Sequence, residues 1–337
     1  MIARILNQAV TEAAFDIIEC KNEQEWLAER DNGVGASDLG VLLGLSEWSS
    51  PFHLWAQKTG RITKGASDAE HLEYGRFMEG GAADRYAYRT GRKLHDLGRF
   101  TILRSKAWPF LFCTLDRIIE SAAAIDSVEA QFYPTEPWMV GPGCCEIKNP
   151  IIHGYRAWDE GVPLHYQSQL QAQLAVTGFA WGSFGASMPD GKFLAIDQQR
   201  NEAFIQMAVE KAAVFMECVK NDTWPPVDGS DWTKLALKAM FPLDNGEDVE
   251  LPPEAVAWDR ELREAKAQIK LAKEHEELMS NKLRAAIGEH TIGRLPNGDC
   301  YTHRTQHREE FVTKASSFRV LRLSEAKAPG GKKKAKS

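Results

Sequence analysis

The chain has 337 residues, of which 43% are hydrophobic and 26% are charged, which is ordinary for a soluble globular protein. This length allows one large domain with an extension, or two modest domains. No apolar run approaches the ~18 residues of a membrane span, and the first 20 residues lack the pattern of a signal peptide, so we expect no membrane segment.

Charge alone does not decide whether the partner is a nucleic acid. The formal net charge of −6 disfavours one, but the distribution of charge matters more than the sum. Residues 75–106 contain eight basic and three acidic side chains, a local excess of five positive charges. Because a solvated helix face explains such a stretch more often than DNA binding does, the stretch alone is weak support for a DNA partner.

The six cysteines show no C-x-x-C spacing. Cys144 and Cys145 are adjacent, and neighbouring residues of a strand point to opposite faces, so the two would not easily join one site. We therefore predict reduced thiols and a cytoplasmic location, in the host cell if the gene is carried by a phage.

The first 90 residues are predicted to be mainly helical. Gly33 and Gly35 break the first helix, and Ser37, alone or with Asp38, can cap the next one. Such a helix N-terminus can also receive a phosphate, and plain capping is an equally good interpretation. In the last of these helices Glu79 borders an apolar stripe. Helices are predicted at residues 1–30, 39–43, 51–58 and 71–90, with a loop at 61–72.

From Leu97 onward the apolar residues follow the period of strands. Residues 121–142 are rich in proline and predict a loop, and Gly178 is placed to end a helix. Strands alternating with helices favour an α/β fold, a mixed central sheet flanked by helices. Strands are predicted at 99–103, 110–120, 144–148, 181–188 and 192–197, and helices at 163–177 and 202–220.

The C-terminal third differs in character. A heptad-like apolar seam from Trp258 to Ala286 predicts a long helix at 254–287, and an Asn-Gly pair predicts a hairpin at 292–304. One more strand is predicted at 318–323. The chain is therefore divided into a first domain (1–226), a linker (227–252), a helical and β-hairpin extension (253–324), and a basic, disordered tail (325–337).

Asp116, Glu146 and Lys148 are the residues with the clearest chemistry. Asp116 is expected near the end of one strand, while Glu146 and Lys148 lie two apart on the next, and so point to one face. Carboxylates on paired strands can hold a hard divalent cation through oxygen. A neighbouring lysine can then orient or deprotonate a water, which is what metal-dependent phosphodiester hydrolysis needs.

This three-residue pattern is weak by itself, because an acid followed by Glu-x-Lys occurs by chance in many surface strands. The neighbours of Glu146 and the aromatic strand before it indicate a buried sheet instead. Buried acids with a buried lysine need a reason, since lone buried charges are costly.

The chain resembles the lambda exonuclease and YqaJ-type viral recombinase family of the PD-(D/E)XK nucleases. The resemblance covers roughly residues 24–225 and rests on four motifs in order, whose combination is more specific than any one of them. They are GVGASD (33–38), preceded by Trp26 and Arg30, YGRFME (74–79), TLD (114–116) with EIKNP (146–150), and YQSQLQ (166–171).

The resemblance implies a role for each site residue. Asp116 would bridge two Mg²⁺ ions, for which Mn²⁺ could substitute, and Glu146 with the carbonyl of Ile147 would complete one metal site. Glu79 would add a further acid, directly or through water. Lys148 would act on the attacking water, supported by Gln169. The expected DNA phosphate contacts are Arg30, Ser37 and Arg76. In the glutamine helix, Gln169 and Gln173 share one face and Gln167 and Gln171 another, and either pair could face the site.

The resemblance also implies a PD-(D/E)XK nuclease domain at 1–226 that trims double-stranded DNA ends, 5′ to 3′, into single-stranded tails for phage-type recombination. It implies work with a single-strand annealing protein and a trimeric ring. A DNA-end-binding protein without hydrolysis and an endonuclease on the same core remain alternatives. The segment between Asp116 and Glu146 is long for a plain hairpin, and residues 227–337 have no counterpart in the minimal nuclease.

Overall fold

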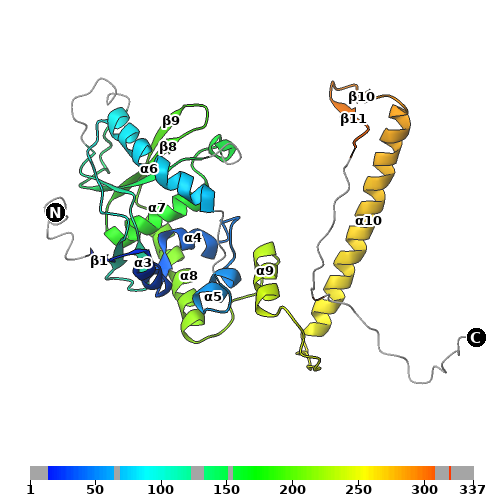
Figure 1. Ribbon diagram of the computed structural model, residues 1–337, viewed down its shortest axis with the longest axis horizontal. Helices are drawn as coiled ribbons and strands as arrows, with labels where there is room; N and C mark the ends of the chain where they lie inside the picture. The colour runs from blue at the N-terminus through cyan, green and yellow to red at the C-terminus, as the bar shows by residue number, and fades with distance from the viewer. Residues whose placement is uncertain (1–13, 64–68, 123–132, 151–154, 308–318, 320–337) are drawn as a thin grey trace, which may run out of the picture. The chain divides into compact units, whose positions relative to one another are not determined.

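The chain is described here by a computed structural model that covers residues 14–63, 69–122, 133–150, 155–307 and 319 (Figure 1). It divides into two compact units, Met1–Phe241 and Pro242–Ser337. The candidate site residues all lie in the first unit.

The larger sheet of the first unit has five strands in mixed directions. In spatial order they are β3 (Leu94–His95), β6 (Arg117–Ile119), β7 (Gly143–Lys148), β8 (Trp181–Ser187) and β9 (Phe193–Gln199). Only β7 and β8 run parallel. Because parallel neighbours need a crossover, the chain between them passes through the 3₁₀ turn Tyr155–Trp158 and the helix α7 (Leu164–Thr177).

Two helices cover the two faces of this sheet. Alternate residues of β7 point to opposite faces. Cys145 packs in a cluster with Tyr86 of α6 (Ala69–Thr90), whereas Cys144 belongs to the main core together with Leu170 of α7. The sheet therefore lies between α6 and α7 (Figure 1).

A smaller sheet changes the prediction for residues 110–120. Its strands, in spatial order, are β1 (Phe15–Glu19), β4 (Thr101–Ser105), β5 (Leu111–Cys113) and β2 (Val34–Gly35). The single strand predicted at 110–120 is two strands, β5 in this sheet and β6 in the larger one. The apolar residues on either side of Asp116 do not reveal this change of sheet, since both strands are largely buried. The break leaves Asp116 at the crossing point, just before β6.

The N-terminal helix predicted at 1–30 is wrong over residues 15–19, which form β1. Phe15 is buried there, and the strand pairs with β4 along its length. A helix, α3 (Glu23–Asp31), begins only after Asn22, whose side chain accepts the N–H of Glu25 at 2.9 Å. Residues 1–13 lie outside the described ranges.

The helices predicted around the sheets are confirmed with small shifts of their ends. The cap predicted at Gly178 is confirmed, with a φ of 74° and its N–H donated to Leu174. These helices are α4 (Ala36–Leu42), α5 (Pro51–Lys58), α6, α7 and α8 (Glu202–Lys220). With the two mixed sheets they confirm the predicted α/β class.

The stretch 227–252, predicted as a linker, contains a helix that belongs to the first unit. This helix, α9 (Asp231–Met240), is capped by Ser230 and buries Ala236. Its Thr233 hydroxyl lies 2.8 Å from that of Ser50, at the start of α5, in a buried contact. The boundary between the units accordingly falls after Phe241 rather than at residue 226.

The second unit has the long helix and the hairpin that the sequence predicts. They are α10 (Ala255–Ile287), β10 (Ile292–Arg294) and β11 (Cys300–Thr302). A Cβ at Gly293 would lie 2.6 Å from Ile287, so the hairpin packs closely on the end of the helix. The heptad-like seam is exposed: Trp258 is 60% and Ile269 54% accessible. The predicted strand 318–323 and the basic tail 325–337 lie, except for residue 319, outside the described residues.

A buried ion pair fixes the C-terminal end of α6 to the sheet. The Arg92 guanidinium is fully buried and donates two hydrogen bonds to the Asp197 carboxylate, at 2.6 and 2.8 Å, and one to the Tyr86 hydroxyl at 2.8 Å. Removing one partner of a buried pair leaves an uncompensated charge in a medium that solvates it poorly.

We predict that Asp197→Asn lowers the free energy of unfolding by about 3 kcal/mol, the size expected for breaking a buried pair. Urea unfolding of the full chain measures it. Asp222→Asn is the matched control, because Asp222 makes the same two-bond contact with Arg61 on the surface, at 2.6 and 2.7 Å. The control should shift the midpoint little. Equal shifts for both variants would show that burial of the Arg92 pair contributes nothing.

Candidate active site

The crossing between the two sheets places Asp116 beside Glu146. Arg117 is paired with Cys145 in the antiparallel ladder of β6 and β7, so Asp116 lies level with Glu146. The Asp116 carboxylate accepts the backbone N–H of Ile147 at 2.8 Å. This bond ties the break between β5 and β6 to the middle of the larger sheet.

Glu146 is the centre of a buried polar network. It is 2% exposed and points toward α7. One carboxylate oxygen lies 2.5 Å from the Lys148 ammonium and accepts the Gln169 amide at 2.6 Å, and the other accepts the Gln173 amide at 2.5 Å. Lys148 also donates to the Gln169 oxygen at 3.3 Å. The charge of Glu146 is thus compensated by one cation and two amides.

The same contacts resolve which glutamines face the site. Gln169 and Gln173, one turn apart on α7, both face Glu146. Gln167 instead donates to the carbonyl of Val162 at 2.6 Å, and Gln171 bonds to the backbone of Gln199. The second pair therefore fastens the helix and takes no part in the polar network.

Burial and neighbouring charges shift the pKa values of Asp116 and Lys148. Burial, followed by the charge of Glu146, raises the pKa of Asp116 well above its usual range; Glu79 adds to this rise, and Lys148 and the Ile147 N–H oppose it. Burial alone would lower the pKa of Lys148, but the charges of Glu146 and Asp116 outweigh it and the net shift is upward. Lys148 is therefore an ammonium in this state, and one carboxylate too many is present for the single lysine.

Glu79 lies on the other side of the sheet, and its carboxylate does not join the Glu146 network. It accepts a 2.8 Å hydrogen bond from Arg117, which also donates to the backbone carbonyl of Asp116. Sequence reasoning did not single out Arg117. A charged residue following Asp116 in an otherwise apolar strand was the available signal.

The oxygen donors fit a hard divalent cation, although the acids do not form a complete cage. Asp116 and Glu146 repel each other in a buried site, and a bound cation would relieve that repulsion. Among the described residues, no group of three or more His, Cys, Asp and Glu side chains could hold a metal ion by itself. A cation held by Asp116, Glu146 and the Ile147 carbonyl would need further oxygen ligands from water or substrate.

The predicted phosphate motif lies near Asp116 by strand register. β2 and β5 are parallel, with Gly35 opposite Phe112, so Ser37 and Thr114 leave the sheet in the same direction. Ser37 is exposed in the first turn of α4 and does not cap it. The N-cap residue is Gly35, and the carboxylate of Asp38, the third helical residue, accepts the Gly35 N–H at 3.0 Å.

Two cations lie beside this turn. The Arg30 guanidinium stacks 4.5 Å from the centre of the Trp26 ring, which holds the side chain in one orientation. Lys58 pairs with Asp38 at 3.3 Å and donates to the backbone carbonyl of Arg30. Sequence reasoning missed Lys58, because the last residue of a helix is too often a lysine to be a signal.

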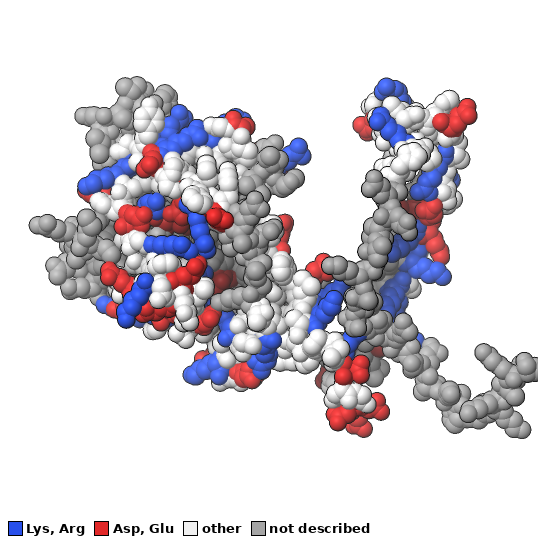
Figure 2. Space-filling model, in the orientation of Figure 1, with Lys and Arg blue, Asp and Glu red and all other residues white. Residues whose placement is uncertain are grey.

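Arg76 is not brought to the acids. It is about half exposed and lies 3.4 Å from Glu23 of α3, which Arg99 also contacts at 2.9 Å. Other cations of residues 75–106 are used in the same way: Lys93 pairs with Glu120, and Arg104 with Glu29. The local excess of positive charge therefore does not form one basic strip, and acidic and basic side chains alternate on the visible face of the first unit (Figure 2).

Comparisons with known proteins support the predicted resemblance. Residues 25–180 match the YqaJ-like viral recombinase domain. The chain is 28% identical over 224 residues to the uncharacterized protein YqaJ of Bacillus subtilis (strain 168), covering 65% of this chain and 64% of that protein. The resemblance to YqaJ-type viral recombinases, inferred from four motifs, is thereby confirmed. The chain spans just under two thirds of this relative's length.

Two solved structures are similar to part of the chain. A crystal structure of an alkaline exonuclease (LHK-Exo) from Laribacter hongkongensis is 21% identical, covers 59% of this chain and 93% of its own, and gives a TM-score of 0.44. The structure of LHK-Exo in complex with dAMP is 19% identical over the same shares, with a TM-score of 0.45.

No helix among the described residues is long and apolar enough to cross a membrane.

The raised pKa of Asp116 predicts that the site destabilises the metal-free protein. Because this pKa is higher in the folded than in the unfolded chain, ionisation costs stability above the unfolded value of about 3.9. Asp116→Asn removes that cost and keeps an oxygen for the Ile147 N–H. Thermal melts in EDTA should show the variant melting a few degrees higher at pH 8, with the difference vanishing near pH 3. An Asn variant less stable at pH 8 would contradict this prediction.

Proposed function

We propose that this chain is a divalent-cation-dependent deoxyribonuclease that shortens duplex DNA from its ends, 5′ to 3′, and leaves single-stranded tails for strand annealing. The observation that carries the proposal is the buried network of Asp116, Glu146 and Lys148. Glu146 and Lys148 lie on the central strand of the larger sheet and Asp116 lies just before the neighbouring strand. Burying these charges costs free energy that packing alone does not require. A protein that only binds DNA would gain nothing from the free-energy cost of burying these charges.

Asp116, Glu146 and the Ile147 carbonyl would hold the cation, and Glu79, whose partner Arg117 also contacts the Asp116 carbonyl, would add a further acid directly or through water. When bound, Mg²⁺ would polarise the phosphate and stabilise the charge on the leaving 3′ oxygen, and Mn²⁺ would serve in its place. The resemblance suggests two ions. Two amides and an ammonium hold the Glu146 carboxylate in one orientation.

Lys148 would orient the attacking water and steady the developing negative charge. Its pKa is raised while Glu146 and Asp116 are unscreened. Cation binding would neutralise those two carboxylates, which removes the cause of the rise and brings the ammonium closer to releasing its proton. Gln169 bonds to both Lys148 and Glu146, and so keeps the ammonium next to the acids.

Arg30 and Ser37 would hold a phosphate of the DNA. Arg30 is kept in place by the Trp26 ring, and Ser37 presents its hydroxyl at the first turn of α4. Parallel pairing of β2 and β5 brings this turn to the strand that leads into Asp116. Arg76 is a weaker candidate, because it lies beside Glu23.

The wider setting of this proposal rests on the resemblance. A trimeric ring around the DNA and work with a single-strand annealing protein are proposed on that basis, as is action in the cytoplasm of the host cell. The two alternative functions, end binding without hydrolysis and endonuclease activity on the same core, differ from the leading one in their products.

One assay separates the three functions. Purified protein is incubated with linear duplex and with covalently closed circular DNA, with Mg²⁺ or with EDTA. Loss of the linear DNA alone, and only with Mg²⁺, supports the proposal. Cutting of the circle supports an endonuclease, and retained end binding without any loss of DNA supports a binding protein.

Lys148→Ala should lower the rate on linear DNA by about 10²-fold or more, the range of a group that acts on a proton in the transition state. Binding to DNA ends, measured in EDTA by fluorescence anisotropy, should change little. Lys234→Ala is the control, since Lys234 is an exposed lysine of α9, away from the acids. Wild-type digestion by the Lys148 variant would show that the site is assigned to the wrong residues.

A further inference from the structure

Within the described part of the chain, Arg117 has three oxygen partners, which come from different parts of the fold. Its Nη1 donates to Glu79 of α6 at 2.8 Å, lies 3.5 Å from the carboxylate of Asp96, and donates to the Asp116 carbonyl. The side chain is 15% exposed, whereas Asp96 is 59% exposed. One guanidinium therefore lies between a carboxylate beside the acid network and a second carboxylate near the surface.

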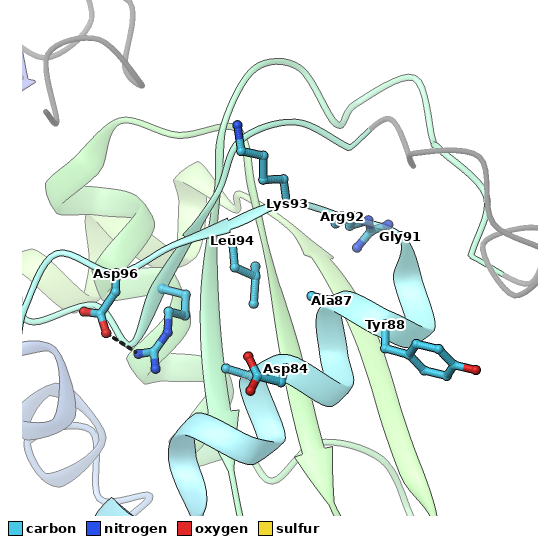
Figure 3. Close-up of a pocket in the computed structure, with 10 residues that line it drawn as sticks. Asp84, Ala87, Tyr88, Gly91, Arg92, Lys93, Leu94 and Asp96 are labelled. Atoms are coloured by element: carbon cyan, nitrogen blue, oxygen red, sulfur yellow. Dashed lines mark ion pairs between the residues drawn. The ribbon is translucent and has the colours of Figure 1, made fainter.

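The position of Arg117 follows from the sheet. It is paired with Cys145 on β7, so its side chain points to the α6 face, opposite to Glu146. There it borders a hollow of about 510 Å³ between α6 and β3, lined also by Asp84, Tyr88 and Asp96 (Figure 3). The ion pair with Asp96 is drawn as a dashed line in that view. The guanidinium thus borders free space, and the nitrogen that contacts Glu79 also has a second carboxylate, that of Asp96, nearby.

Glu79 cannot serve two cations equally. One nitrogen of Arg117 contacts both the Glu79 carboxylate and the backbone carbonyl of Asp116, so the Glu79 carboxylate lies beside the strand break that carries a proposed cation ligand. A carboxylate oxygen that accepts a close guanidinium bond is less available to a metal ion or to a metal-bound water. Asp96 lowers the free-energy cost of separating Arg117 from Glu79, because Arg117 would keep one carboxylate partner after releasing Glu79.

We propose that Arg117 is a positioning residue that competes with the divalent cation for Glu79, and that Asp96 takes the guanidinium when Glu79 is released. The inference rests on the proposed function, in which the acids hold a cation. Arg117 then sets how tightly the acid cluster binds its metal, while the buried network around Glu146 is left intact.

A double-mutant cycle on cation binding tests this proposal. Mn²⁺ is titrated into the full-length protein without DNA, and free Mn²⁺ is followed by electron paramagnetic resonance. Arg117→Met should tighten Mn²⁺ binding roughly tenfold, which corresponds to about 1.4 kcal/mol. Glu79→Gln should weaken it. In the Glu79→Gln background, Arg117→Met should change the affinity by less than about twofold. The tenfold effect disappears there because the Glu79 carboxylate, for which Arg117 competes, is absent.

Two outcomes of the cycle would overturn the proposal. An equal gain from Arg117→Met in both backgrounds would show that Arg117 acts only as a nearby positive charge. Weaker binding by Arg117→Met with Glu79 intact would show that Arg117 holds Glu79 ready for the cation. If the Met variant does not fold, Arg117→Lys should still tighten binding by a smaller factor, because a single ammonium makes a poorer partner than the guanidinium; a Lys variant that binds no tighter than wild type overturns the proposal as well.

Asp96→Asn is the matched variant, since it removes only the alternative partner. Of the acids among the described residues, Arg117 then keeps only Glu79, so Mn²⁺ binding should become several-fold weaker, opposite to the effect of Arg117→Met. A merely structural role of the cluster would move both variants in the same direction, which would count against the proposal.

The failure of this inference is distinguishable from failure of the proposed function. If wild-type protein binds no Mn²⁺, or if Glu146→Gln binds it as tightly as wild type, the cation site itself is wrong. If wild type binds Mn²⁺, Glu146→Gln does not, and the cycle shows no coupling between Arg117 and Glu79, only the competition is wrong.

Discussion

The hydrogen bonds and the ion pair that compensate the buried Glu146 carboxylate determine how helix α7 packs on the larger sheet. Glu146 sits in the middle of a buried strand, where an unpaired charge would be prohibitive. Lys148 from the same strand and two amides from α7 satisfy it. These bonds fix the rotation of α7 about its axis, because Gln169 and Gln173 must face β7. The opposite glutamines are then left to hold β9 and the start of the helix. The geometry of the candidate site and the packing of α7 are therefore set by the same contacts.

A break in a strand supplies the second carboxylate. The chain leaves the smaller sheet after β5 and enters the larger one at β6, and Asp116 lies in between, bonded to the N–H of Ile147. Parallel pairing of β2 with β5 brings the turn that carries Ser37 alongside the end of β5, which leads into Asp116. The junction of the two sheets is therefore where an acid pair and a candidate phosphate site meet, and neither sheet alone would contain both.

Helix α6 connects stability to the site. Its C-terminal end is fastened by the buried pair of Arg92 with Asp197, and one of its earlier turns carries Glu79, paired with Arg117. Arg92 belongs to residues 75–106, the stretch whose excess of positive charge was weak support for a DNA partner, whereas Arg117 lies outside it. In the structure Arg92 is a buried internal contact, while Arg117 belongs to the acid cluster. Charge in a sequence indicates a surface only when the charges remain unpaired after folding.

The sequence by itself determined the elements with strong periodicity and the identity of the main acids. The α/β order, α7 with its Gly178 cap, the β8–β9 pair, α10, and the Asp116, Glu146 and Lys148 set all follow from local patterns or motif spacing. Only the tertiary structure decided the split at Asp116, the strand at Phe15–Glu19, the docking of α9, and the partners of Glu79, Arg76 and Gln173. The physical reason is range. Periodicity and capping depend on residues within a few positions of each other. Ion pairs such as Arg117 with Glu79 join residues 38 positions apart. Which residues pair depends on which sheet face and which helix turn meet after the core has packed.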